Sequence, residues 1–368
     1  MGKQKTLVPW FQRGDIGGMT YSITNNIVNY LIVIATLSGV LEWPDKIVYG
    51  YVIPGMSIGL LCSGVYYAYM GRRLSKKEGR ADVTALPSGV STPAMFVMLY
   101  GVIMPLHYAL NDAELAWSAA VAACFIGGLF ETVLGSFLKP LRKFFPSVVT
   151  GTVVLSIGLS LIAVGISSFG GGSSAKDYGS LENLFVGFVV LVVIVVLKHG
   201  TKGFTSFASI LIGIIVGYVL VSIMAAVLPT TFTYVDDAGA TVEATKSWVL
   251  NWDKVASASW FAVPKIMPVK WVFDARAIVP ICIMFIVTAV ETVGDISGIT
   301  EGGLGREATD KELSGGVMCD GLGSSLAAVF GVLPNTSFSQ NVGLVAMNKV
   351  VNRFSIATGG IFLIACGL

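Results

Sequence analysis

Three carboxyl side chains lie in strongly apolar stretches of the sequence, where an ionised group is costly. Glu291 and Asp295 are four residues apart and therefore share one helix face. Asp320 lies in a second apolar stretch. Intramembrane carboxyls cost at least a few kcal/mol each and normally serve a function, such as accepting N–H groups or carrying a proton. Asp295 could instead order neighbouring groups near a span end, and Asp320 could bond to broken-helix backbone.

Glu131 is a fourth carboxyl in apolar sequence, but it is a weaker candidate. It lies within two or three helical turns of Lys139 and Arg142. We therefore expect Glu131 to face the cytoplasmic rim rather than a binding site.

Two neighbouring amides, Gln340 and Asn341, lie in a polar stretch, residues 333–343, that also contains Pro334. A backbone in lipid must satisfy its own hydrogen bonds, so such a break is tolerated only inside protein or beside a watery cavity. Amides donate and accept at once, as an uncharged heterocycle with alternating N–H and C=O groups requires. The alternative is that both amides only cap the broken backbone.

The elements that position these residues are predicted to be transmembrane helices. The chain has 368 residues, of which 54% are hydrophobic and 12% charged, about half the charged fraction of a soluble domain. The five Cys and two His form no disulfide or metal-binding pattern. Apolar segments of roughly 20 residues suit helical spans, and we assign them to residues 19–41, 47–70, 82–105, 115–138, 145–169, 181–198, 204–228, 277–300, 313–332, 333–350 and 354–368.

The third and tenth of these spans share a broken pattern. Each has Leu-Pro, at Pro87 and Pro334, and a hydroxyl residue five places later, Thr92 or Ser339. We predict that residues 84–91 and 334–338 are extended and adjacent, and that Thr92 and Ser339 cap half-helices of about 10–12 residues. The two spans run in opposite directions, as in inverted-repeat transporters with a mid-membrane site. The alternative is that Pro and Gly are simply common in membrane helices.

Lys and Arg gather in alternate short loops, for example at Arg72, Lys143 and Arg306. This bias predicts a cytoplasmic N-terminus. The long segment 229–276 would lie outside, and its Thr- and Val-rich pieces, 230–235 and 240–244, predict a small hairpin.

Four motifs together resemble the nucleobase–ascorbate transporter family, which includes the xanthine and uracil permeases. They are the signature Gln340-Asn341-Val342-Gly343, the acidic motif from Glu291 to Asp295, Asp320-Gly321-Leu322, and residues 145–152. The resemblance implies that Glu291 and Gln340 hold a nucleobase beside Asn341, and that Asp295 and Asp320 support binding or coupling. It implies less directly that Ser91 and Thr92 pack on the base. The Gln at the first signature position, Gln340, resembles the purine members of the family, whereas the uracil members more often have Glu at this position.

The sequence departs from that family in three respects. Asn25-Asn26 stands where the family usually has Gln-His, which alters the expected hydrogen-bond network, and Asn348 replaces a signature Thr. The family has fourteen spans in two inverted sets of seven, whereas this chain ends within the eleventh. We therefore expect a fragment with a cytoplasmic segment 1–18, a core domain from 19–138 and 277–368, a gate domain 145–228 and an extracellular segment 229–276.

The resulting expectation is an all-α polytopic protein of the inner membrane, with short β-strands in its two broken spans. It would import a purine-type nucleobase, xanthine or urate, by proton symport, without a cofactor, a metal or catalytic residues. We expect contact with lipid and a homodimer, and no nucleic-acid partner. The alternatives are sodium-coupled import of uracil or another base, an anion transporter of the same fold, and an intramembrane enzyme using Glu291 and Asp295 as an acid pair.

Overall fold

The computed structural model describes residues 26–80, 82–83, 88–137, 147–172, 175–202, 204–236, 239–257, 263–337 and 342. The chain divides into two compact units, one formed by Met1–Ile157 with Phe261–Leu368 and the other by Gly158–Trp260. The described residues are mainly helical, with two short strand pairs. This confirms the predicted fold class. The core and gate assignment stays a prediction.

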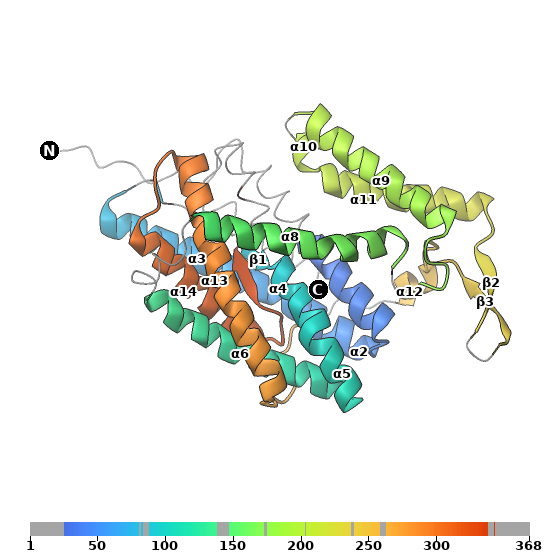
Figure 1. Ribbon diagram of the computed structural model, residues 1–368, viewed down its shortest axis with the longest axis horizontal. Helices are drawn as coiled ribbons and strands as arrows, with labels where there is room; N and C mark the ends of the chain where they lie inside the picture. Colours follow the sequence, from blue (N-terminus) through green and yellow to red (C-terminus); the bar gives the residue numbers. More distant parts are fainter. Residues whose placement is uncertain are drawn as a thin grey trace. The chain divides into compact units, whose positions relative to one another are not determined.

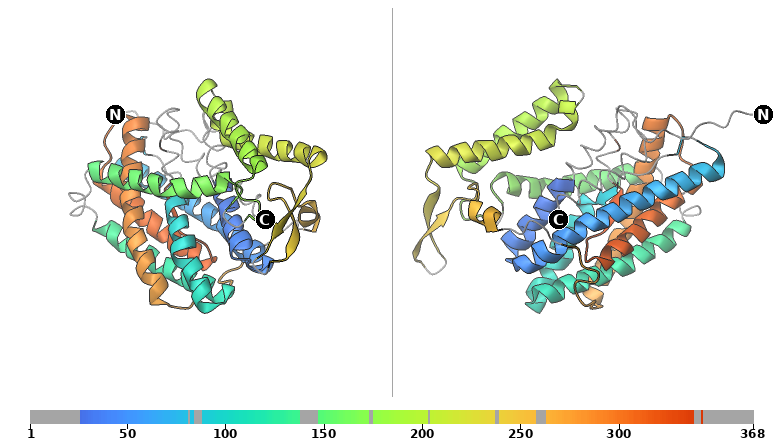
Figure 2. Two further views of the ribbon diagram at one scale, coloured as in Figure 1. Left: turned by 45° about the vertical axis from the view of Figure 1, so that its right-hand side comes forward. Right: turned by 180° about the vertical axis from the view of Figure 1, so that it is seen from behind.

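The first unit is a bundle of long helices around a central strand pair (Figure 1). Its long helices α3, α6, α13 and α14 pack against one another, and Figure 2 shows α3, α6 and α14 running side by side. Its described elements are η1 (Ala35–Val40), α2 (Asp45–Ile47), η2 (Val48–Val52), α3 (Ile53–Glu78), β1 (Ser88–Val90), α4 (Thr92–Met98), η3 (Leu99–Ile103), α5 (Met104–Leu110), α6 (Ala113–Ser136), the start of α8 (Ser147–Phe169), α13 (Ala275–Leu304), α14 (Asp310–Val329) and β4 (Asn335–Ser337).

Glycines on α6 allow α13 and α14 to approach closely. A Cβ added to Gly128 would lie 2.5 Å from the carbonyl oxygen of Gly321, and one added to Gly135 would lie 2.8 Å from the backbone nitrogen of Met318. Small residues at such contacts let helix backbones come together in membranes. The two glycines are seven residues apart, so they define one face of α6.

Two wide π-helical segments precede prolines. η2 ends two residues before Pro54 of α3, and η3 ends two residues before Pro105 of α5. Proline lacks the N–H of an ordinary helical turn and clashes with the carbonyl one turn back, so local widening accommodates it. The helix that starts at Thr92 therefore continues through Pro105 to Leu110, longer than the predicted half-helix. It ends at Asn111, whose φ of +52° is left-handed.

Strands β1 and β4 pair antiparallel at the centre of this unit. Their register joins Ser88 to Ser337, Gly89 to Thr336 and Val90 to Asn335. Short strands from distant parts of the chain thus satisfy each other's backbone groups. The prediction of adjacent extended segments is confirmed for residues 88–90 and 335–337, while residues 84–87 and 338 lie outside the described parts.

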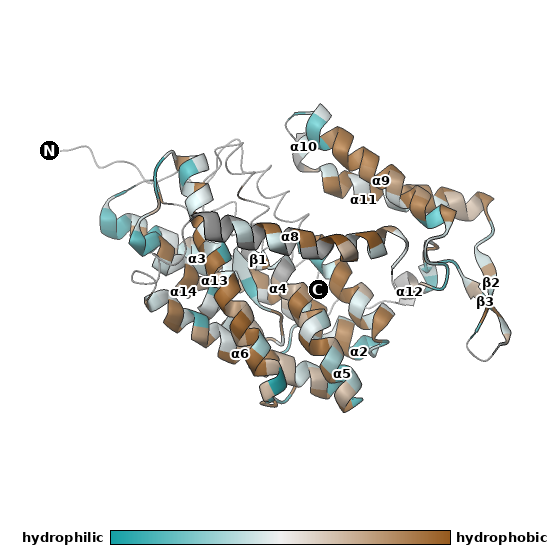
Figure 3. Ribbon diagram, in the orientation of Figure 1, coloured by the Kyte–Doolittle hydropathy of each residue, from teal (hydrophilic) through white to brown (hydrophobic). Residues whose placement is uncertain are grey.

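The second unit contains the rest of α8, α9 (Leu181–Gly200), α10 (Phe204–Phe207), α11 (Ser209–Val227), β2 (Thr231–Val235), β3 (Thr241–Thr245) and α12 (Trp252–Ser257). Strands β2 and β3 form the predicted hairpin, with Thr231 opposite Thr245. Helices α9 and α11 are apolar along almost their whole length (Figure 3). Both leave many large apolar side chains exposed, including Phe188 and Ile223, which suits a lipid-facing surface.

Five segments among the described residues are long and apolar enough to cross a membrane. They are Asp45–Glu78, Ala113–Ser136, Leu181–Gly200, Ser209–Val227 and Ala275–Leu304. Each overlaps a predicted span. The predicted span at residues 354–368 lies outside the described residues.

Candidate functional site

The candidate site lies where α13 and α14 meet the paired strands β1 and β4. Asp295 comes from α13, Asp320 from α14 and Ser337 from β4. All three side chains are at most 5% exposed. Asp295 and Asp320, which come from different helices, are therefore brought together beside β4, the strand within the broken span at residues 333–350.

Asp320 is fully buried and is surrounded by hydroxyl groups that donate hydrogen bonds to it. The hydroxyls of Tyr67 on α3 and Thr292 on α13 donate to its two carboxylate oxygens. The Thr336 hydroxyl on β4 donates to Oδ2 over 3.0 Å. Donors from three separate elements can hold a charged carboxylate in a dry interior, because hydrogen bonds to the ionised form stabilise it.

Asp295 lies one turn after Glu291 on α13 and is joined to β4. The Ser337 hydroxyl donates to Asp295 Oδ2 over 2.6 Å. Ser337 Oγ and Thr336 Oγ1 each lie 3.2 Å from the Thr292 hydroxyl oxygen. Asp295 and Asp320 therefore belong to one network of hydroxyl groups centred on Thr292.

Glu291 is 5% exposed and faces the interior of the first unit. It lies on α13 between Thr288 and Thr292. Glu291 is therefore buried, as expected for a carboxyl in an apolar stretch of the sequence.

Glu131 does not face the rim, so the expectation for this residue is wrong. It is fully buried, and the Thr288 hydroxyl donates to its Oε1 over 2.9 Å. Its neighbours Gly128 and Gly135 bring α14 against the same part of α6. The signal that sequence reasoning missed is this small-residue face, since Glu131 is three residues after Gly128 and four before Gly135.

The start of α4 is capped by Ser91 rather than by Thr92, which corrects the predicted cap. Ser91 Oγ accepts from the backbone N–H of Ala94 over 3.4 Å and is buried. The Thr92 hydroxyl instead donates to Asn29 Oδ1 over 3.1 Å. The geometry favours Ser91 because its hydroxyl faces the third helical N–H, the usual partner of an N-cap.

Asn29 is a second residue that sequence reasoning missed. Besides accepting from Thr92, its amide donates to the Val90 carbonyl over 2.6 Å, so it fastens the N-terminal helical segment Asn26–Val40 to β1 and α4. It is three residues after Asn26, which is also fully buried, and this spacing places both on one helix face.

Gln340, Asn341, Ser339 and Asn25 lie outside the described residues. Val342, two residues after Gln340, is described and lies against α13. A Cβ added to Gly298 would be 2.6 Å from Val342 Cγ1. The predicted roles of Gln340 and Asn341 therefore stay predictions.

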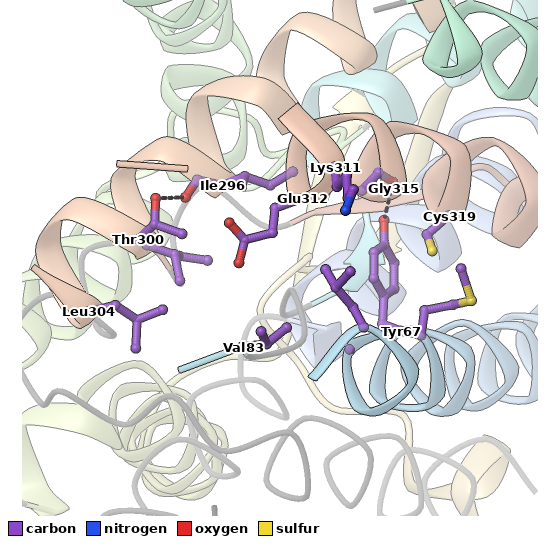
Figure 4. A pocket seen from close by; sticks show the side chains of 14 residues that line it. Tyr67, Val83, Ile296, Thr300, Leu304, Lys311, Glu312, Gly315 and Cys319 are labelled. Carbon is purple, nitrogen blue, oxygen red and sulfur yellow. Dashed lines mark hydrogen bonds between the residues drawn. The ribbon is translucent and has the colours of Figure 1, made fainter. Parts of the chain in front are cut away.

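A cavity of about 140 Å³ lies beside this network, between α3, α13 and α14 (Figure 4). Its walls include Ile296, Ile299 and Cys319, but not Glu291 or Asp295. Tyr67 lines the cavity and its hydroxyl also donates to Asp320. The network contains the predicted coupling residues Asp295 and Asp320, whereas the described lining of the cavity contains none of the predicted substrate residues.

An ion-pair cluster joins the chain after α3 to the turn between α13 and α14. Arg306 donates to Asp82 over 2.7 Å and to Glu312 over 2.6 Å. Arg80 contacts the same two carboxylates at 3.0 and 3.2 Å. Burial alone would raise the pKa of Glu312, but hydrogen bonds from Arg306 and Thr309 outweigh it and lower that pKa.

Comparison with known proteins decides the family. A sequence model of the permease family (Xan_ur_permease) matches residues 82–368. The chain belongs to this family, the nucleobase–ascorbate transporters. It is therefore a multi-pass membrane protein of a permease family and not an enzyme, which sets aside the acid-pair alternative for Glu291 and Asp295.

Several curated relatives are similar to this permease chain. A putative purine permease of Clostridium perfringens is 39% identical over 67% of the chain and 49% of its own length. The xanthine permease of Bacillus subtilis is 33% identical over 76% of the chain and 58% of its own length. The uric acid transporter UacT of Escherichia coli is 29% identical over 76% and 53%. The chain thus spans about half the length of the curated relatives it matches.

The fold resembles the transmembrane domain of the cyanobacterial bicarbonate transporter BicA. The TM-score is 0.56 and the identity 14%, over 96% of this chain and 82% of that domain. At this identity the similarity concerns the fold alone.

Proposed function

We propose that the chain forms the substrate-binding part of a secondary transporter that imports a purine-type nucleobase, xanthine or urate. The observation that carries the proposal is the buried cluster of carboxyls and hydroxyls at the β1–β4 crossing. Polar groups buried inside a membrane protein mark substrate and ion pathways. The relatives, which are named as purine, xanthine and uric acid transporters, suggest the substrate class.

In this proposal, Glu291 and Gln340 contact the base. Glu291 accepts N–H groups, and the amide of Gln340 pairs with an N–H and C=O edge. Asn341, Ser91 and Thr92 complete the contacts. The N-terminus of α4, capped by Ser91, adds a positive dipole end that favours electron-rich groups of the ligand.

Alternating access would follow from the proposed domains. Residues 19–138 and 277–368 would move as a core against a gate that includes residues 145–228, around a fixed site. The Arg-rich end with Arg80 and Arg306 would be cytoplasmic, with the N-terminus inside, and the protein would be a homodimer of the inner membrane.

We further propose that a proton is the coupling ion. Glu291 lies in a buried region together with Asp295 and Asp320, and interacting carboxyls take up and release protons as a group. Binding of base N–H donors favours an ionised acceptor, so proton and base occupancy are linked, and this linkage is reciprocal.

Competition for labelled xanthine uptake tests the substrate class. Purified full-length protein in vesicles is given a panel of unlabelled xanthine, urate, uracil, adenine, bicarbonate and sulphate. We expect xanthine and urate to compete, and bicarbonate and sulphate to have no effect. Competition by bicarbonate or sulphate alone would support an anion transporter of the same fold.

Imposed ion gradients test the coupling. Uptake is measured with a pH gradient in the absence of sodium, then with a sodium gradient at equal pH. We expect the pH gradient to drive accumulation. Uptake that follows only the sodium gradient would assign coupling to a cation site near Asp295 and Asp320.

A further inference from the structure

Glu131 is a buried carboxyl that the proposed binding role does not use. It lies in the C-terminal half of α6, fully buried, with its Oε1 2.9 Å from the Thr288 hydroxyl. Its Oε2 has no hydrogen-bond partner among the described residues. A fully buried carboxylate with a single neutral donor would be very costly, whereas a protonated carboxyl is tolerated.

The hydroxyl of Thr288 shows which form fits the geometry. Its oxygen lies 2.9 Å from Glu131 Oε1 and 3.1 Å from the Phe285 carbonyl oxygen. A hydroxyl has one proton. An ionised Glu131 and the carbonyl must compete for it. A protonated Glu131 instead donates to the hydroxyl oxygen, and Thr288 then donates to Phe285, so both short distances become hydrogen bonds.

The groups that surround Glu131 supply no cation in the described parts of the chain. The helices packed on α6 are α13, α14, α5 and the η3 segment. The titratable group of α13 that acts electrostatically on Glu131 is Glu291, and like charges repel. The cations of these elements pair elsewhere, Arg276 with Asp274 and Lys311 with Glu78. Other titratable groups of the packed elements also have partners: Asp295 accepts from Ser337, Asp320 from Tyr67 and Thr292, and Glu312 from Arg306, while His107 contacts Trp43 and Tyr100 contacts Thr36.

We propose that Glu131 is a positioning residue that keeps a proton while Glu291 binds the base, and so sets the alkaline limit of binding. The inference rests on the proposed nucleobase function. Thr288 is one turn before Glu291 on α13, so Glu131 and Glu291 act on the same turn of helix. Loss of the Glu131 proton places a second negative charge near Glu291 and disturbs the Thr288 turn, which weakens binding.

The test is base affinity as a function of pH, measured with labelled xanthine for the parent and for Glu131→Gln. The amide is neutral at every pH and can still donate to Thr288, so the variant imitates the protonated form. We expect affinity within about twofold of the parent at acidic pH and an alkaline fall displaced upward by at least about one pH unit, which is roughly tenfold tighter binding at the alkaline end.

Matched variants separate this role from a structural one. Glu114→Gln makes the same chemical change on an exposed position of α6 and should leave the profile unchanged. Thr288→Val removes the hydrogen-bond partner of Glu131 in both its protonated and its ionised form. Because a hydrogen bond to an ionised carboxylate is about twice as strong as one between neutral groups, the ionised form loses more, and the alkaline fall should move in the same direction. It also provides a second readout if Glu131→Gln accumulates poorly.

Infrared spectroscopy gives a readout that needs no substrate. A protonated carboxylic acid has a C=O stretch distinct from that of a carboxylate, and we expect Glu131→Gln to remove one such band from the parent spectrum at neutral pH. An unchanged pH profile, a uniform loss of affinity at every pH, or no lost band would overturn the proposal for Glu131. A parent protein that binds no nucleobase would overturn the proposed function itself, whatever the infrared result.

Discussion

Asp320 and Glu131 are both fully buried carboxyls on neighbouring helices, yet their surroundings differ. Asp320 accepts hydrogen bonds from hydroxyls on α3, α13 and β4. Glu131 has a single hydrogen-bond partner among the described residues, the Thr288 hydroxyl. Burial disfavours charge at both positions, but donors offset this cost only at Asp320. Equal burial therefore supports different chemistry, namely a fixed acceptor at Asp320 and a proton holder at Glu131.

The largest expected effect is the loss of protein stability when the carboxyl of Asp320 is removed. Asp320→Ala removes the shared acceptor of three buried hydroxyls, of which Tyr67 keeps only the more distant Gly316 carbonyl at 3.3 Å, while Thr292 and Thr336 keep only hydroxyl neighbours. Each unsatisfied group costs roughly 1–3 kcal/mol, and the sum is comparable with the net stability of about 5–15 kcal/mol of a typical domain. We expect little folded protein or a much lower unfolding temperature in detergent.

Glu131→Ala is the matched comparison, because it removes one acceptor and leaves one donor, Thr288, which keeps its bond to the Phe285 carbonyl. It should lower the unfolding temperature clearly less than Asp320→Ala. Equal losses for the two variants would contradict the difference between the two surroundings.

The next largest effect concerns Glu291. This residue lies on α13 between Thr288, which contacts Glu131, and Thr292, which donates to Asp320. Glu291→Ala and Gln340→Ala each remove a proposed partner of the base. Loss of a partner in a buried polar site costs roughly 1–3 kcal/mol, or about 5- to 150-fold in affinity. Glu291→Gln keeps the shape but loses charge-assisted bonds, which are about twice as strong as neutral ones.

Binding of labelled xanthine and of competing bases measures these changes. Glu114→Gln, on an exposed part of α6, is the control and should bind like the parent. Unchanged affinity of the Glu291 and Gln340 variants for every base that the parent binds would rule out their assignment.

A smaller effect is expected where β4 meets Asp295. Ser337→Ala removes the 2.6 Å hydrogen bond to Asp295 Oδ2. A typical hydrogen bond contributes about 0.5–1.5 kcal/mol, so base affinity should fall about 2- to 12-fold. Ser325→Ala is the control, since the buried Ser325 hydroxyl donates only to the Phe125 carbonyl among its described partners. An equal fall in both variants would indicate a packing effect rather than a role of Asp295.

The sequence predicts much of this frame because the relevant signals are local. Pro87 and Pro334 mark segments that cannot continue as ordinary helix, and the strand pair lies beside them. The Thr- and Val-rich segments of the long connection likewise form a hairpin. The carboxyls Glu291, Asp295 and Asp320 are recognised because charge within apolar sequence is costly.

The remaining features depend on which helix faces meet, and a linear sequence does not contain that information directly. Glu131 is close in sequence to Lys139 and Arg142, but its burial is decided by Gly128 and Gly135, which admit α14. The cap moves from Thr92 to Ser91 because Asn29, from another helix, accepts the Thr92 hydroxyl. In both cases a contact across the bundle overrides a local preference.

The smallest expected effect concerns Glu312, a carboxyl at the start of α14 with cations beside it. It accepts from Arg306 and Arg80, and its pKa is lowered although burial opposes this. A carboxyl with a lowered folded-state pKa stabilises the protein above its ordinary pKa of 4.5, and this contribution disappears as pH falls through the lower value. Glu312→Gln keeps the cap on α14 but removes the charge.

We therefore expect the free energy of unfolding of Glu312→Gln at pH 7 to be lower than that of the parent by about 0.2–1 kcal/mol per ion pair lost. The variant should accordingly unfold at a slightly lower temperature. The difference should shrink as pH falls below 4.5 and disappear once pH passes the lowered pKa of the folded-state carboxyl. It should also shrink in high salt, which screens charges near the surface. Glu307→Gln changes an exposed carboxyl in the same turn and should show no such dependence. A Glu312→Gln difference that persists unchanged at low pH would show that Glu312 acts through packing, as a neutral group does, and would remove the contrast between cation-paired Glu312 and proton-holding Glu131.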